Sequence, residues 1–201
     1  MKRFAAVALA WLLLLPGCTR SRVNQPQPPP RDRAIAVFPP NNRSGDPLLV
    51  AGASFFEKYA LKSDRITVPD VLASEARLQL ERRGYTVVPP ATVDAVVGEH
   101  PPQSMADAAA IAARHQMEAW VLYIDIRRWE ADVPYKPTFV IASVEVSLID
   151  PASGNVVWHI DHPSKPVQTN GVINLGDAYT VAAQQLMEEL SAPLGPALQV
   201  R

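Results

Sequence analysis

The sequence predicts an α/β domain with a mixed sheet of about five strands, built from two strand–helix crossovers, an antiparallel meander and a C-terminal helix. Two observations predict this class. Short apolar runs alternate with helical patterns in the first part of the chain, and longer alternating runs joined by a turn signal follow in the second part. A chain of 201 residues suits one such domain with short terminal segments.

The first crossover is expected to begin with residues 34–38, an uninterrupted apolar run that is typical of a central strand buried on both faces. Residues 41–47 have the composition of a loop, and residues 48–59 carry a weaker helical pattern. Residues 70–83 divide into an apolar stripe and a polar face, which predicts a helix, and residues 85–88 form the next strand.

The second crossover is expected to contain a short helix over residues 91–98 and an alanine-rich helix over residues 104–115, with Ser104 as its N-cap. A strand follows over residues 120–126. Because side chains alternate along a strand, Trp120 and every second residue after it share one apolar face.

The pattern then changes to a hairpin and a final helix. Residues 138–149 alternate between apolar and polar side chains, which predicts a long strand with one face on a core. Residues 150–155 are a strong turn signal, and residues 156–160 return as the next strand. Residues 175–190 carry an amphipathic helical stripe that would cover the sheet.

The N-terminal residues 1–17 read as a secretory signal peptide. Lys2 and Arg3 precede an uncharged apolar run over residues 5–15, which is shorter than the roughly 20 residues of a membrane span. A membrane anchor that keeps this run and carries a plain thiol is the alternative. We expect the run to be removed.

Cys18 is the predicted lipidation site. Leu15, Pro16 and Gly17 lead into it and resemble the bacterial lipobox recognised by signal peptidase II, although proline is uncommon at the second of these positions. The resemblance implies that the sulfur carries a diacylglyceryl group and that the new amino terminus carries a further acyl chain such as palmitate. Two or more chains suffice for stable membrane attachment.

Composition limits what the mature protein could do. Cys18 is the only cysteine, so the folded part has neither an internal disulfide nor a thiolate metal site. Loss of Lys2 and Arg3 leaves 17 basic against 20 acidic side chains, a balance that does not favour a nucleic-acid partner. Residues 18–33 are rich in proline and polar residues and are expected to be a tether, with one periplasmic domain over residues 34–201.

Four segments carry a resemblance to a known family: FPPNN at 38–42, RGYTVVP at 83–89, WVLYI at 120–124 and LIDPASGNVVW at 148–158. They resemble the outer-membrane lipoproteins first noticed as neisserial surface antigens. That family is similar in fold to the periplasmic domain of the curli-secretion lipoprotein CsgG, to the amino-terminal domain of TolB and to the lipoprotein activator of a peptidoglycan synthase.

The resemblance implies a non-enzymatic protein that needs no cofactor and binds other envelope proteins in a cell-envelope or secretion complex. A CsgG-like lipoprotein and further copies of the chain itself are the expected partners. Thr19, in place of the aspartate that retains enterobacterial lipoproteins in the inner membrane, suggests by the same kind of likeness the periplasmic side of the outer membrane. A regulator of peptidoglycan synthesis is the alternative function.

Three groups of side chains are candidates for a site. Asp125 and Glu145 could form a carboxylate pair for a periplasmic hydrolase, or could pair with Arg127 and Arg128 on a wet sheet face. No nucleophile elbow, phosphate loop or zinc-binding helix accompanies them.

His159 and His162 could contact a metal only if the strand bent between them, because residues three apart point to opposite faces. We therefore expect no metal site there. Trp129 and Tyr135 are expected in an exposed connection, as a partner contact or as an ordinary loop.

Overall fold

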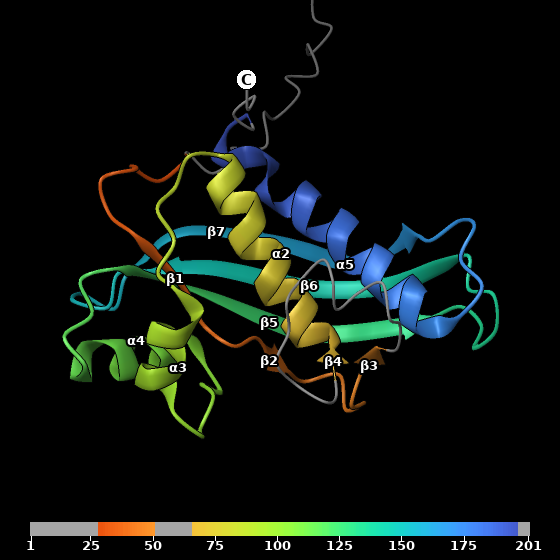
Figure 1. Cartoon of the computed structure of the whole chain (residues 1–201), viewed down its shortest axis with the longest axis horizontal. Coiled ribbons are helices and arrows are strands. Elements are labelled where there is room, and N and C mark those ends of the chain that lie inside the picture. Colours follow the sequence, from red (N-terminus) through yellow and green to blue (C-terminus); the bar gives the residue numbers. More distant parts are fainter. Residues whose placement is uncertain (1–27, 51–65, 197–201) are drawn as a thin grey trace, which may run out of the picture.

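A computed structural model describes residues 28–50 and 66–196, and it arranges them as a mixed sheet with helices on both faces (Figure 1). The sheet contains five strands in the order β1-β5-β6-β7, with β2 also paired to β5. β1 (Ile35–Val37) and β2 (Asn41–Asn42) run parallel to β5 (Trp120–Ala131). β6 (Phe139–Ile149) and β7 (Val156–Gln168) continue the sheet antiparallel. The predicted fold class is confirmed.

The helices of the first face are α2 (Val68–Arg82) and α5 (Leu175–Ser191). A small antiparallel pair, β3 (Leu49–Val50) and β4 (Ile66–Thr67), precedes α2, and the short helix η1 (Ala192–Leu194) follows α5. Thr67 caps α2 by a reciprocal capping box with Asp70, so the helix begins two residues before the predicted start. Figure 1 shows both long helices lying across the strands of this face, which we call the α2/α5 face.

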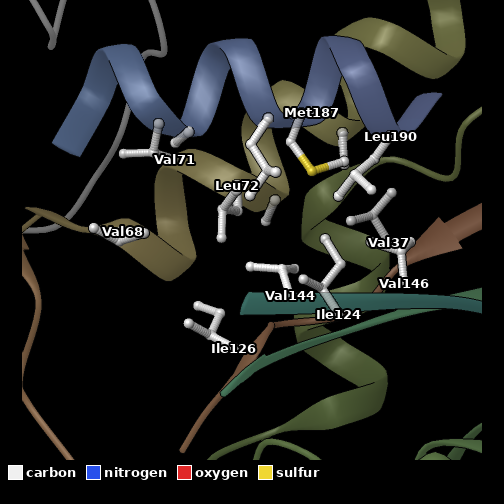
Figure 2. Packing of buried hydrophobic residues seen from close by; sticks show 14 of the residues in the cluster. Val37, Val68, Val71, Leu72, Ile124, Ile126, Val144, Val146, Met187 and Leu190 are labelled. Carbon is white, nitrogen blue, oxygen red and sulfur yellow. The ribbon is translucent and has the colours of Figure 1, made fainter. Parts of the chain in front are cut away.

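The main core fills the space between these two helices and the sheet. Alternating residues of β5 and β6, such as Ile124, Val144 and Val146, point up toward Leu72 of α2 and Met187 of α5 (Figure 2). The predicted inward stripes of these strands and of the C-terminal helix are confirmed, because the same residues are buried here.

The opposite face is only partly covered. α3 (Pro90–Val97) and α4 (Met105–Arg114) pack against β1 and the first half of β5 through a smaller apolar cluster that includes Phe38, Val121 and Tyr123. Ser104 accepts from the backbone N–H of Asp107 as the predicted N-cap of α4. We call this side the α3/α4 face.

Three expectations about secondary-structure elements need correction. Residues 85–88 make only one parallel bridge, from Val87 to Ile35, so β1 lies between this bridge and β5. Asn41 and Asn42, expected in a loop, pair with β5 as β2. Of the helix expected over residues 48–59, Leu49 and Val50 form β3, and residues 51–59 lie outside the described residues.

β5 and β7 both continue past their predicted ends, and the register with β6 shifts at β-bulges along them. In β5 the extra residue is Arg127, between the pairs made by Ile126 and Arg128. β7 has two such places: Pro163 and Ser164 stand opposite one residue of β6, and Val157 is extra between the pairs made by Val156 and Trp158. The edge position of β7 tolerates Pro163 and Pro166, because no further strand among the described residues pairs with β7 and needs their missing N–H groups.

Candidate functional site

Beyond the cluster of α3 and α4, the α3/α4 face carries a row of polar side chains across four strands. The register places Asn41 of β2 beside Asp125 of β5, Asp125 beside Glu145 of β6, and Glu145 beside Asp161 of β7. We call these four residues the cross-strand row. Like charges directly opposite each other destabilise a sheet, so three adjacent carboxylates need cations among them.

Asp125 is the most buried carboxylate of the row, and both of its oxygens are occupied. Arg43 donates from Nε to Oδ1 at 2.9 Å and from Nη2 to Oδ2 at 2.5 Å, the two-pronged geometry of strong arginine–carboxylate pairs. Asn41 donates from Nδ2 to Oδ1 at 3.2 Å. The hydrogen bond to Asp125, followed by its charge, raises the pKa of the Arg43 guanidinium.

Arg127 supplies the second cation and reaches all three carboxylates. Its Nε lies 3.4 Å from Oδ2 of Asp125, its Nη1 lies 3.8 Å from Oδ1 of Asp161, and it pairs directly with Glu145. The expected pairing of Arg127 with the two carboxylates is therefore confirmed. Arg128 instead pairs with Glu130 of its own strand at 2.6 Å.

Ser147 and His159 lie next to Glu145 and bring together the residue types of a serine-hydrolase triad. Ser147 Oγ lies 3.1 Å from Nδ1 of His159, and Oε1 of Glu145 lies 3.5 Å from the same nitrogen. A triad needs the two partners on different ring nitrogens, because one nitrogen takes the hydroxyl proton while the carboxylate holds the other. Ser147 is also fully buried. The arrangement is therefore not that of an activated nucleophile.

The carboxylate pair is adjacent, as predicted, but it is arranged as an ion network. A general acid must be free to give its proton to a substrate atom within hydrogen-bond reach. Asp125 is enclosed by Arg43, Asn41 and Arg127, and Glu145 is shared between Arg127 and His159. This geometry favours a charged surface held in a fixed arrangement over a hydrolytic centre.

His159 and His162 lie on opposite faces of β7, as the strand period predicts. His159 is exposed on the α3/α4 face, whereas His162 is buried beneath α5, with Nδ1 3.7 Å from Oε1 of Glu189. Among the residues that the structure describes, no group of three or more His, Cys, Asp or Glu side chains is placed to hold a metal ion.

The expected exposure of Trp129 is wrong. Its side chain is 0% exposed and packs edge-on against Tyr179 of α5, with ring centroids 6.2 Å apart. The bulge at Arg127 is the reason: one extra residue reverses the alternation of β5, so Trp129 shares the core face with Ile126.

Tyr135 is exposed as expected, and two apolar side chains that were not predicted are exposed in the connections beside it. Tyr135 is 79% exposed, Ile173 is 68% exposed and Val133 is 43% exposed. The β5–β6 and β7–α5 connections meet here, because Lys136 donates its N–H to Ile173 O at 3.3 Å and Thr169 donates to Thr138 O at 2.8 Å. We call Val133, Tyr135 and Ile173 the tip. Sequence pattern alone could not bring Ile173 beside Tyr135, since 38 positions separate them.

The predicted lipobox residues Leu15, Pro16 and Gly17 and the predicted lipidation site Cys18 lie outside the described residues. Within residues 28–50 and 66–196, no helix has the length and apolar character needed to span a membrane.

These features define a class: an α/β domain with a mixed sheet, a charged row on its open face and an apolar tip. No family model matches the chain, and no curated protein matches it. Solved structures do. PelC from Paraburkholderia phytofirmans, a dodecamer, is similar over 87% of this chain and 96% of its own, with a TM-score of 0.51 and 18% identity. At this identity the likeness shows a shared fold.

Two further solved structures are similar over less of the chain. Lipoprotein GNA1162 from Neisseria meningitidis covers 65% of this chain and 80% of its own, with a TM-score of 0.41 and 20% identity. The LpoB C-terminal domain from Salmonella enterica covers 68% of this chain and 83% of its own, with a TM-score of 0.39 and 16% identity.

Proposed function

We propose that this chain is a non-enzymatic lipoprotein of the bacterial cell envelope that works as a binding and assembly component. In this proposal residues 1–17 are removed, Cys18 is acylated, and the domain is attached to the periplasmic side of the outer membrane. The apolar run ending at Leu15 and the single cysteine after Gly17 support the attachment.

The observation that carries the binding role is the tip. Exposed aromatic residues are enriched among the anchors of protein interfaces. Tyr135 and Ile173 are exposed in two connections that a backbone hydrogen bond from Lys136 to Ile173 brings together. The backbone of the tip has a defined conformation, since hydrogen bonds join its two connections and Lys136 lies in the left-handed region at φ 53°.

Further copies of the chain are the first proposed partner, and other envelope proteins, including a CsgG-like lipoprotein, are the second. PelC, which shares the fold, is a dodecamer, and this supports assembly of the present chain with itself. The ion network argues against a hydrolase, because its carboxylates are engaged by arginine.

The experiment compares the full-length lipidated protein with the variant Tyr135→Ser, Ile173→Ser. Both are extracted from membranes in mild detergent, and the mass of the complex and the co-purifying proteins are measured. Val156→Ser is the matched control, because Val156 is also exposed but begins β7 at the other hairpin. We expect the double variant to lose its assembly or its partners and the control to keep them. Unchanged complexes in the double variant would exclude the tip as the binding surface.

A further inference from the structure

The last part of the predicted tether is packed against the domain. Pro29 is buried, and the hydroxyl of Tyr85 lies 3.2 Å from Pro29 O and 3.3 Å from Leu194 O. The guanidinium of Arg31 lies over the Tyr85 ring, 5.3 Å from its centroid. We call these four residues the Tyr85 junction. It joins the segment before β1 to the end of η1.

Neighbouring contacts hold the same segment along its length. Arg33 pairs with Asp150 in the β6–β7 turn at 3.2 Å. A Cβ added at Gly195 would lie only 3.2 Å from a guanidinium nitrogen of Arg31, so the chain after η1 passes close to this arginine. Residues 29–33 are thus fixed to the domain at several points.

The Tyr85 junction and the tip lie at opposite ends of α5. Ile173 comes just before the first residue of the helix, and Leu194 closes η1 directly after its last residue. A helix of 17 residues is about 25 Å long, so the two sites are separated by roughly this distance. In Figure 1 the two ends of α5 are far apart along the molecule.

We propose that the Tyr85 junction sets the orientation of the domain on the membrane, with the junction toward the lipid surface and the tip away from it. This inference rests on the proposed acylation of Cys18. Only residues 19–28 would then link the lipid to the junction, and ten residues span about 17 Å as a flexible chain or roughly 31 Å as a polyproline helix. Without the junction, residues 19–33 would span about 21 Å as a flexible chain or about 46 Å as a polyproline helix, and the linker would no longer leave the domain at the junction end of α5.

The test measures the distance of each end from the bilayer. The lipidated full-length protein receives one new cysteine, either Ala192→Cys beside the junction or Asn170→Cys beside the tip; both positions are exposed. Because Cys18 is the only natural cysteine and its sulfur would be acylated, the new thiol is the only one that takes a fluorescent donor. Vesicles of phosphatidylcholine and phosphatidylglycerol carry an acceptor on a headgroup.

We expect energy transfer from position 192 to be roughly twofold or more stronger than from position 170, given the helix length between them. Tyr85→Phe combined with Arg31→Ala removes the hydroxyl and the cation of the junction, and should bring the ratio toward one. Tyr135→Phe removes a hydroxyl at the tip and should leave the ratio unchanged.

Equal transfer from both positions, or stronger transfer from position 170, in protein that mass spectrometry shows to be acylated would overturn the orientation and leave the lipoprotein assignment standing. A chain with a free Cys18 thiol that does not bind vesicles would overturn the lipoprotein assignment and, with it, this inference.

Discussion

At the scale of single residues, Trp129 shows how a buried aromatic depends on its strand. Its indole Nε1 has no hydrogen-bond partner among the described residues. We expect Trp129→Ala to lower the free energy of unfolding by about 3–5 kcal/mol, because it leaves a large cavity in the core. Trp129→Phe removes the unpartnered N–H and should cost less than about 1.5 kcal/mol. Urea denaturation measures both, and equal costs for the two variants would contradict this account.

Arg127 is the residue on which the cross-strand row depends. Arg127→Ala leaves Asp125, Glu145 and Asp161 opposite one another, with Arg43 as the one arginine still paired with them in the described part of the chain. We expect the free energy of unfolding to fall by about 1–2 kcal/mol, since the site is partly exposed. Added salt should restore part of this loss by screening the carboxylates.

The matched control is Arg128→Ala, whose partner Glu130 lies on the exposed surface. It should leave the urea midpoint unchanged within error. An equal fall in the free energy of unfolding for the two arginine variants would show that the ion network around Arg127 stabilises the fold no more than an exposed ion pair does.

The sequence could predict the carboxylate pair and Arg127, but not Arg43 and Asn41. Asp125 and Glu145 follow from two alternating strands that are consecutive in the chain. Arg43 and Asn41 lie more than 80 positions before Asp125 and reach it through the parallel pairing of β2 with β5. Local periodicity contains no information about such a pairing.

At the scale of elements, Asp132 holds the base of the β5–β6 connection that carries Tyr135. Its carboxylate accepts from the hydroxyl of Thr138 at 2.7 Å and from the N–H of Thr138 at 3.0 Å. The side-chain hydrogen bond from Thr138 is the main reason that the pKa of Asp132 lies below its ordinary value of 3.8. A carboxyl whose pKa is lower in the folded state stabilises the fold above its unfolded pKa and stops doing so as the pH falls through the folded one.

We therefore expect Asp132→Asn to be less stable than the natural chain at neutral pH and to approach it in stability below about pH 4. Urea midpoints measured in parallel from neutral to acidic pH test this, because the other carboxyl groups are common to both proteins. A gap that widens on acidification would show that Asp132 does not act through its charge.

Element boundaries were predictable where the chain signals them locally. Thr67 and Asp70, Ser104 and Gly84 mark helix ends by caps and by a positive φ, and α2, α4 and α5 lie within two residues of their predicted bounds. The lengths of β5 and β7 were not predictable. A bulge adds one residue without any composition of its own, and the pairing across the sheet decides where it falls.

At the scale of the whole molecule, the two faces of the sheet differ in how much apolar core they carry. The α2/α5 face contains the main core, whereas the α3/α4 face carries the cross-strand row, in which Asn41 and Asp125 are buried and Asp161 is exposed. The order of crossovers and meander predicted a mixed α/β domain, but it left open whether helices cover one face of the sheet or both. The cross-strand row depends on the register between the four strands, which the periodicity of each strand does not determine.

The last prediction separates a binding protein from a hydrolase. Asp125→Asn with Glu145→Gln keeps the size of both side chains and one acceptor oxygen each, but it removes the carboxylates that acid–base chemistry would need. Loss of a general acid or base lowers a rate by about 10²–10⁴-fold. A binding protein should instead rescue a deletion strain of its own host as well as the natural chain does, while Cys18→Ser should fail through loss of attachment. If the amide variant is lipidated, melts within a few degrees of the natural chain and still fails to rescue, the carboxylates are required for function, as they would be in a hydrolase or in a charged binding surface, and the tip alone does not explain the activity.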